Sequence, residues 1–203
     1  MLSLAHASVA VGAVAAAGIA AVVASRARPS TTGGAAVPWD DLELVPLGFG
    51  YTLADLTRTG RNIDPPAELG GEIAAALALT WSRVGAPAVA LGAGITSGYR
   101  WPELNTLIGG SPTSYHLTGH ALDLSPPPGR DAAWLLEELQ KAGVQWRDAI
   151  VYAPRDGGHL HVDVPRAGAP FTNRIKAHNT AIASSYPVQP SPAAARAYVE
   201  RTA

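Results

Sequence analysis

The sequence predicts an α+β fold in which helices pack on one face of a small antiparallel sheet. Residues 120–124 and 159–164 alternate polar and apolar side chains, as strands with one buried face do. Residues 69–84 carry large apolar side chains at the three- and four-residue spacing of a helix. A two-layer domain buries the apolar stripe of such a helix against the apolar face of such strands.

The first 28 residues differ in composition from the rest of the chain. Residues 2–24 carry no formal side-chain charge, are rich in Ala and Val, and are long enough to cross a bilayer as a helix. The first basic side chains, Arg26 and Arg28, follow the apolar run, whereas a secretory signal carries its positive charge before that run. We therefore expect an extra N-terminal apolar helix over residues 1–28, either a membrane anchor or a helix buried in a protein assembly.

Composition divides the remainder of the chain into a linker, one domain and a tail. Residues 29–38, with paired Thr and paired Gly, are typical of a linker. The domain is predicted to span residues 39–166, and residues 167–203 are predicted to form a C-terminal tail. Within the tail, the proline-rich residues 186–192 favour an extended segment and residues 193–201 favour a short helix.

Helix-capping and turn residues set the expected element boundaries within the domain. Asp64 and the two prolines after it predict the start of a helix with a buried stripe, and Asp131 predicts the cap of a second helix that runs to about residue 142. The stripe comprises Leu69, Ile73, Leu77, Trp81 and Val84. The other expected elements are a strand over residues 88–96, a strand over 149–153, a tight turn over 154–158 and a hairpin partner over 159–164.

Charge and cysteine content exclude two classes of protein. The net charge is −1 at pH 7 and no basic stripe is present, so nucleic acid is not expected as a partner. The chain has no cysteine, which excludes both disulfides and a metal site with thiolate ligands.

Four of the six histidines lie between His116 and His161, next to two aspartates. Strand alternation places Asp123 on the polar face of its strand, and places His159 and His161 together on the polar face of theirs. If these faces meet, His116 from the preceding loop completes a set of two imidazoles and a carboxylate. Such a set holds Zn²⁺ with one position open, which is typical of catalytic sites. The alternative is that these side chains form the ordinary polar face of a solvated sheet.

The ordered pattern of these residues resembles a known family. Residues 114–123 read Ser-x-His-x-x-Gly-x-Ala-x-Asp, and a His-x-His follows at residues 159–161. Together with Ser-Gly-Tyr-Arg at residues 97–100, Pro-Glu-Leu-Asn at 102–105 and Gly-Gly at 109–110, this pattern resembles the zinc D-Ala-D-Ala carboxypeptidases of peptidase family M15. That family includes related murein endopeptidases and phage endolysins. The resemblance runs from about residue 51 to residue 165.

The resemblance implies specific roles for several side chains. It makes residues 39–166 an M15-like zinc peptidase domain with His116, Asp123 and His161 as the zinc ligands, and it implies that Arg100 and Ser114 contact substrate. A guanidinium suits a terminal α-carboxylate because its fixed fork donates two parallel hydrogen bonds. The alternative for Arg100 is a structural ion pair with a neighbouring acid.

The general base is less clearly indicated by the sequence. Many relatives carry Glu three residues before the last zinc ligand, but this chain has Gly158 there. His159 matches a family variant in which the first His of the pair handles the proton, and Asp156 in the preceding turn is the competing candidate. Asp163 is expected to accept a hydrogen bond from a ligand imidazole and so to orient that ring. His120 points away from Asp123 by strand parity and is expected to be a surface residue.

The resemblance implies a zinc metallopeptidase that hydrolyses peptidoglycan stem peptides at a D-amino acid. Whether it acts as a carboxypeptidase or an endopeptidase stays open. Residues 1–24 are expected to attach the chain to a membrane or to a phage or injection particle. From there it is expected to act on the cell wall. The alternative is a structural or adaptor component of a particle or membrane that retains the peptidase fold without turnover. Gly158 and the apolar N-terminus both favour this alternative.

Overall fold

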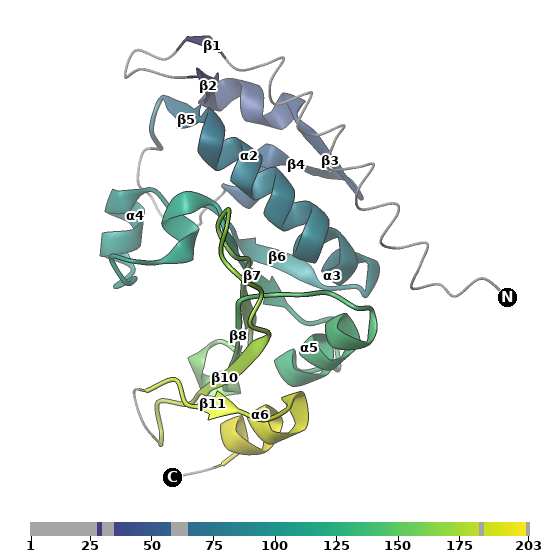
Figure 1. The fold of residues 1–203 in the computed structure, drawn as a ribbon. Coiled ribbons are helices and arrows are strands. Elements are labelled where there is room, and N and C mark those ends of the chain that lie inside the picture. Colours follow the sequence, from purple (N-terminus) through teal and green to yellow (C-terminus); the bar gives the residue numbers. More distant parts are fainter. Residues whose placement is uncertain (1–27, 30–34, 58–64, 183–184, 202–203) are drawn as a thin grey trace, which may run out of the picture.

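The computed structural model describes residues 28–29, 35–57, 65–182 and 185–201. The predicted N-terminal apolar helix and the predicted helix start at Asp64 fall outside these residues. Within them, helices and a mainly antiparallel sheet form the α+β fold that the sequence predicts (Figure 1).

The central sheet has six strands in the order β11-β10-β8-β9-β7-β6. Neighbouring strands are antiparallel except β10 and β8, which are parallel. The strands are β6 (Gly94–Ser97), β7 (Ala121–Ser125), β8 (Asp148–Tyr152), β9 (Leu160–Asp163), β10 (Arg174–His178) and β11 (Val188–Gln189). The segment after residue 166, predicted as a tail, thus contributes two strands to this sheet.

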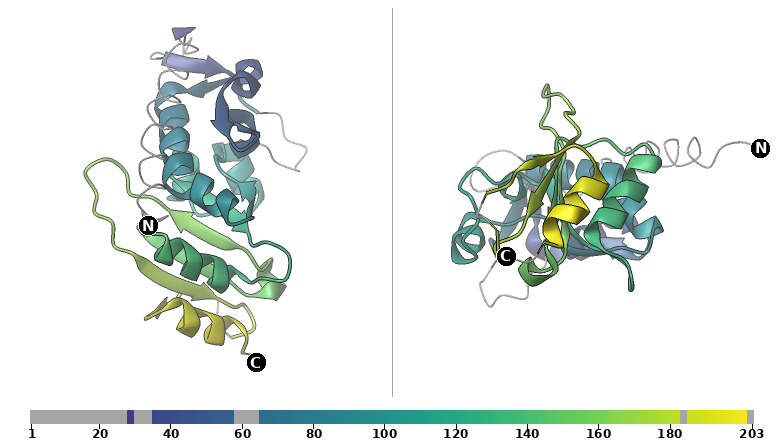
Figure 2. Two further views of the ribbon diagram at one scale, coloured as in Figure 1. Left: turned by 90° about the vertical axis from the view of Figure 1, so that its right-hand side faces the viewer. Right: turned by 90° about the horizontal axis from the view of Figure 1, so that it is seen from below.

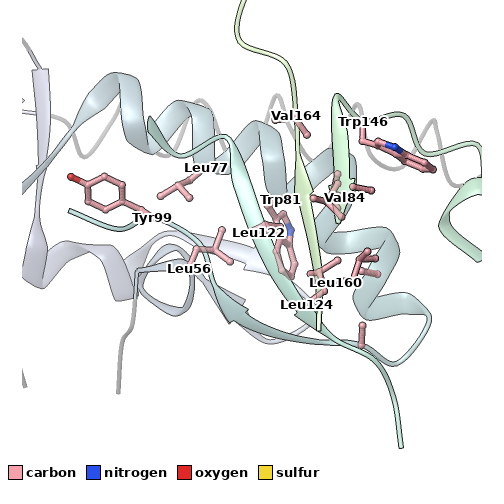
Figure 3. Close-up of a cluster of buried hydrophobic side chains, with 14 of the residues drawn as sticks. Leu56, Leu77, Trp81, Val84, Tyr99, Leu122, Leu124, Trp146, Leu160 and Val164 are labelled. Carbon is pink, nitrogen blue, oxygen red and sulfur yellow. The ribbon is translucent and has the colours of Figure 1, made fainter. Parts of the chain in front are cut away.

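Helices cover one face of the sheet and enclose the core. The buried face consists of the apolar side chains of β7, β8 and β9, and Leu122, Leu124 and Leu160 are fully buried with Trp81 (Figure 3). The covering helices are α2 (Gly71–Thr80), η3 (Trp81–Gly85), α3 (Ala86–Ala90), α5 (Ala132–Lys141) and α6 (Pro192–Val199). Helices α5 and α6 lie side by side (Figure 2), while the short α4 (Pro102–Leu107) lies on the opposite side of the sheet (Figure 1).

Residues 71–90 form one helix, which corrects two predicted boundaries. The helix begins at Gly71, and Leu69 belongs instead to strand β5 (Glu68–Gly70). The strand predicted over residues 88–96 is confirmed only from Gly94, because the helix continues through Pro87 to Ala90. The π-helical turn η3 widens the helix before this proline, which has no N–H to donate. Gly92, at φ +86°, ends the helix, so the strand begins only at Gly94.

The 71–90 helix is long and apolar enough to cross a membrane. Its position argues for a core helix instead, because Ala74, Leu77, Trp81 and Val84 are fully buried against the rest of the protein. Leu77, Trp81 and Val84 confirm this part of the predicted apolar stripe, and Ile73 packs on the core from a half-buried position.

The residues before this helix form a separate layer that supports the site. The linker predicted over residues 29–38 is corrected in part, because β2 (Ala35–Pro38) pairs with β1 (Arg28–Pro29) and β5. Backbone pairing, which composition does not reveal, makes this segment a strand. The layer also contains η1 (Trp39–Leu44), β3 (Pro46–Gly48), β4 (Tyr51–Thr52) and η2 (Leu53–Leu56). The Leu56 carbonyl accepts a 2.7 Å hydrogen bond from the Tyr99 N–H, which fixes the segment that carries Arg100.

Other predicted elements are confirmed. Asp131 caps α5 by accepting a 2.6 Å hydrogen bond from the Trp134 N–H. Strands β8 and β9 form the predicted hairpin around η5 (Pro154–Asp156), and residues 192–199 form the predicted C-terminal helix.

Candidate metal centre and its cavity

The open face of the sheet collects the polar side chains that the sequence singles out. In the strand register Asp123 lies opposite His161, and His161 lies opposite Ile150. These three residues therefore form a row across the face, because side chains directly opposite one another in a sheet share a face. Asp163 lies two residues further along β9 on the same face, as strand alternation predicts.

His116 reaches this row from the single turn η4 (Tyr115–Thr118) that precedes β7. Ser114 caps this turn, and its Oγ accepts a hydrogen bond from the His116 N–H. Gly119 ends the turn at φ +72°, where a Cβ would lie 2.8 Å from the Ile73 carbonyl oxygen. Only glycine fits this close passage, which turns the chain from η4 into β7 and holds the His116 ring over Asp123.

Three potential ligand atoms converge in a buried position. The distance from His116 Nε2 to Asp123 Oδ1 is 3.3 Å, from His116 Nε2 to His161 Nδ1 3.1 Å, and from His161 Nδ1 to Asp123 Oδ1 2.8 Å. His116 is 1% exposed and Asp123 is 6% exposed. A group of two imidazoles and a carboxylate this close together is able to hold one metal ion.

The outward nitrogen of each imidazole is held by an acceptor, which is the arrangement a metal ligand needs. His116 Nδ1 lies 2.5 Å from the Gly98 carbonyl oxygen. Because a carbonyl only accepts, this nitrogen carries the proton and Nε2 presents its lone pair to the site. His161 Nε2 lies 2.8 Å from Asp163 Oδ1, so Asp163 orients this ring. The residues present therefore fit a bound metal.

Electrostatic coupling sets the protonation of the group. Burial lowers the pKa of His116 and favours its neutral form. Burial also opposes charge on His161, but hydrogen bonds to Asp123 and Asp163 raise its pKa to about 9. Burial alone would raise the pKa of Asp123; the adjacent His116 and His161 instead hold it well below its ordinary value. The carboxylate is therefore ionised at neutral pH, as a metal ligand must be.

A cavity of about 630 Å³ opens over the three converging side chains. It is lined by Arg100, Ser114 and His159 as well as by the group itself. Asp156 is not among the lining residues. Its carboxylate accepts hydrogen bonds from the Thr180 N–H at 2.9 Å and from the Thr180 hydroxyl at 2.5 Å. Thr180 lies in the turn that follows β10.

Residues 67–163 match the family model described as Peptidase M15. This part of the chain belongs to the peptidase M15 family. The match encloses His116, Asp123 and His161, and members of this family depend on zinc. No curated protein matches the chain significantly. M15 membership indicates, in general terms, a metallopeptidase that acts on peptidoglycan and takes a peptide substrate.

Arg100 of the M15 domain contacts Asp123 and also lines the cavity. Its Nη2 forms an ion pair with Asp123 Oδ2, on the side of the carboxylate that does not face the imidazoles, and its Nε donates a 2.9 Å hydrogen bond to Ser97 Oγ. The ion pair is the one expected of a structural arginine. The guanidinium also lines the cavity, so contact with substrate stays a prediction.

His159 lies on the cavity wall beside the predicted ligands of the M15 domain. Its ring stacks on Tyr152, with centroids 4.1 Å apart and planes 15° apart. Burial lowers the pKa of His159, which keeps the ring neutral at pH 7. His120 lies outside the cavity lining, half-buried, with its Nδ1 2.7 Å from the Thr118 carbonyl oxygen.

The cavity of the M15 domain also has lining residues that the sequence does not single out. Tyr152 follows from the same alternation as His161, since it shares the face of Ile150 in β8. Tyr115, Arg147, Arg166 and Tyr186 reach the cavity only through tertiary folding. No local pattern of residues marks these four.

We predict that the purified protein binds close to one zinc per chain. His116→Ala and Asp123→Ala should each remove one of three ligands and lose the metal, as measured by elemental analysis after gel filtration. His120→Ala is the matched control and should keep its zinc, because this histidine lies outside the cavity lining. Full zinc content in either ligand variant would contradict the assignment.

Proposed function

We propose that this protein is a zinc peptidase that hydrolyses peptidoglycan stem peptides at a D-amino acid. The observation that carries the proposal is the convergence of His116, Asp123 and His161 within an M15 domain, at the floor of a cavity. The size of the cavity, about 630 Å³, is that of an ordinary small-molecule or peptide pocket. Both D,D-carboxypeptidase and endopeptidase action are consistent with this site.

The groups around the cavity have different roles in the proposed hydrolysis. Zinc, when bound, polarises the scissile carbonyl and lowers the pKa of the attacking water toward about 7. The Gly98 carbonyl and Asp163 keep the two imidazoles in place. His159, neutral and on the same strand face as His161, accepts the proton from the water and passes it to the leaving amine. Arg100 binds the terminal carboxylate of the peptide through its guanidinium fork.

A non-catalytic adaptor is the second candidate function. It is favoured by Gly158, which stands where many M15 relatives carry a catalytic Glu. Gly158 has φ +59° in the turn before β9, so a side chain there would be strained. The cell-wall assays below separate the two functions, because an adaptor would leave purified walls intact.

We also propose that residues 1–24 place the enzyme at a membrane or in a particle such as a phage. The composition of this segment supports the proposal, since so much Ala and Val is unfavourable in water. A reporter protein fused after residue 28 should sediment with the membrane or particle fraction. A reporter that stays freely soluble would exclude both versions.

Two variants test which side chain handles the proton. We predict that His159→Ala keeps its zinc and digests purified cell walls about 10²–10⁴-fold more slowly, the usual cost of losing a general base. Asp156→Ala should change the rate little, because Asp156 is hydrogen-bonded to Thr180 and lies outside the cavity lining. The reverse result would transfer the role to Asp156. Loss of zinc from His159→Ala would make His159 itself a ligand.

Recognition of a terminal carboxylate is tested with Arg100→Lys. We predict that this variant loses about 10- to 100-fold more kcat/KM on a peptide ending in free D-Ala-D-Ala than on its C-terminal amide, because Lys cannot reproduce the two-donor fork. Disruption of the Arg100–Asp123 ion pair affects both substrates equally and cancels in the comparison. An equal loss on acid and amide would leave Arg100 a structural residue.

A further inference from the structure

We propose that Arg166 and Arg147, which meet at the ring of Tyr115, form a second anion-binding subsite in the cavity. This subsite binds a carboxylate on the amino-terminal side of the scissile bond, separate from the terminal carboxylate. The inference rests on the proposed peptidase function and narrows its substrate class to peptides with an acidic residue before the cleavage point.

The two guanidinium groups share one aromatic ring. The Cζ atom of Arg147 lies 3.9 Å from the centroid of the Tyr115 ring, and that of Arg166 lies 4.5 Å from it. All three residues line the cavity, and Tyr115 directly precedes His116. The ring fixes both guanidiniums by cation–π contact, and so orders two flexible side chains before any ligand arrives.

The charges around this pair are unbalanced. Arg147 forms ion pairs with Asp163 at 2.5 Å and with Asp148 at 3.0 Å. Both carboxylates are already shared, Asp148 with Arg174 and Lys176, and Asp163 with His161. The two carboxylates therefore share ion pairs with three cationic side chains and one imidazole, and Arg166 is not among these.

Arg166 adds a further positive charge at the cavity. It is exposed, and among the residues that the structure describes no carboxylate lies within ion-pair distance of it. In addition, Arg147 Nε is buried and has no hydrogen-bond partner within the described part of the chain. An anionic ligand in the cavity would pair with the exposed Arg166 guanidinium, and the positive charge of Arg147 beside it would add to the attraction.

The position of the pair distinguishes it from the site proposed for the terminal carboxylate. Arg100 contacts Asp123, which contacts His161, and His161 contacts Asp163, which contacts Arg147. Arg100 and the arginine pair therefore lie at opposite ends of a continuous series of contacts through the metal centre. A peptide whose terminal carboxylate is held by Arg100, with its scissile bond at the centre, directs its preceding residues toward Arg147 and Arg166.

The test uses synthetic peptides ending in D-Ala-D-Ala that carry either Glu or Gln, in turn, at each of the two residues before that pair. At one of these two positions the Glu side chain should reach the arginine pair. There the zinc-loaded full-length protein should bind and cleave the Glu peptide in preference to the Gln peptide. Arg166→Ala should lower kcat/KM and affinity for that Glu peptide by about 3- to 10-fold, the range for a partly exposed charged contact, and leave the Gln peptide unchanged. Arg166→Lys should restore part of the preference because it keeps the charge.

Arg130→Ala is the matched control. Arg130 is also an exposed arginine over an aromatic ring, with its Cζ 4.9 Å from the Trp134 centroid, but it does not line the cavity, and its loss should change neither peptide. An equal effect of Arg166→Ala on Glu and Gln peptides, or no Glu preference in wild-type protein, would overturn the subsite. Binding is measured calorimetrically as well as by turnover. The wild-type protein could cleave no peptide and yet bind the Glu peptide more tightly than the Gln peptide. If Arg166→Ala then abolishes this binding preference, the peptidase proposal fails and the subsite stands.

Discussion

The alternation of side chains along β7, β9 and β8 is the constraint on which the rest of the structure depends. Leu122, Leu124 and Leu160 must face the helices, and burying each such side chain contributes roughly 1.5–3 kcal/mol. Asp123 and His161 then have to face the opposite side, in register with each other. A slip of one residue would bury both polar side chains and expose the leucines. The packing that forms the core therefore also fixes two of the three potential ligands.

The third potential ligand and the surrounding charges depend on contacts that no strand supplies. His116 is held by the tight turn at Gly119 and by the Gly98 carbonyl, which the N-terminal layer positions through Leu56. Burying this many polar groups is favourable only when each has a partner. Asp123 illustrates the solution, because one oxygen faces the imidazoles and the other faces Arg100. The candidate metal centre is thus one member of a longer series of alternating charges.

Sequence reasoning succeeded where the signal is local. Two-residue alternation predicted the shared face of His161 and Asp163, and a capping aspartate predicted α5. It failed at Pro87, because a π-helical turn that carries a helix past a proline depends on tertiary packing rather than on propensity. It also missed the parallel pairing of β10 with β8, since such pairing is set by the path of the connecting chain. Two arginines of the cavity wall were missed because they lie in no motif: Arg147 and Arg166 meet only at the ring of Tyr115.

The candidate metal centre and part of the cavity wall come from different parts of this chain. The stretch that matches the M15 family, residues 67–163, contains the three potential ligands together with Arg100 and His159. Part of the cavity wall lies beyond it: Arg166 follows β9 directly, and Tyr186 approaches from the segment between β10 and β11. The positions of Asp123 and His161 are fixed by the core beneath them. The wall residues Arg166 and Tyr186 are exposed, so substitutions there leave the packing of the core unchanged. A chain that keeps the centre and varies the wall retains one reaction while changing the peptide on which it acts.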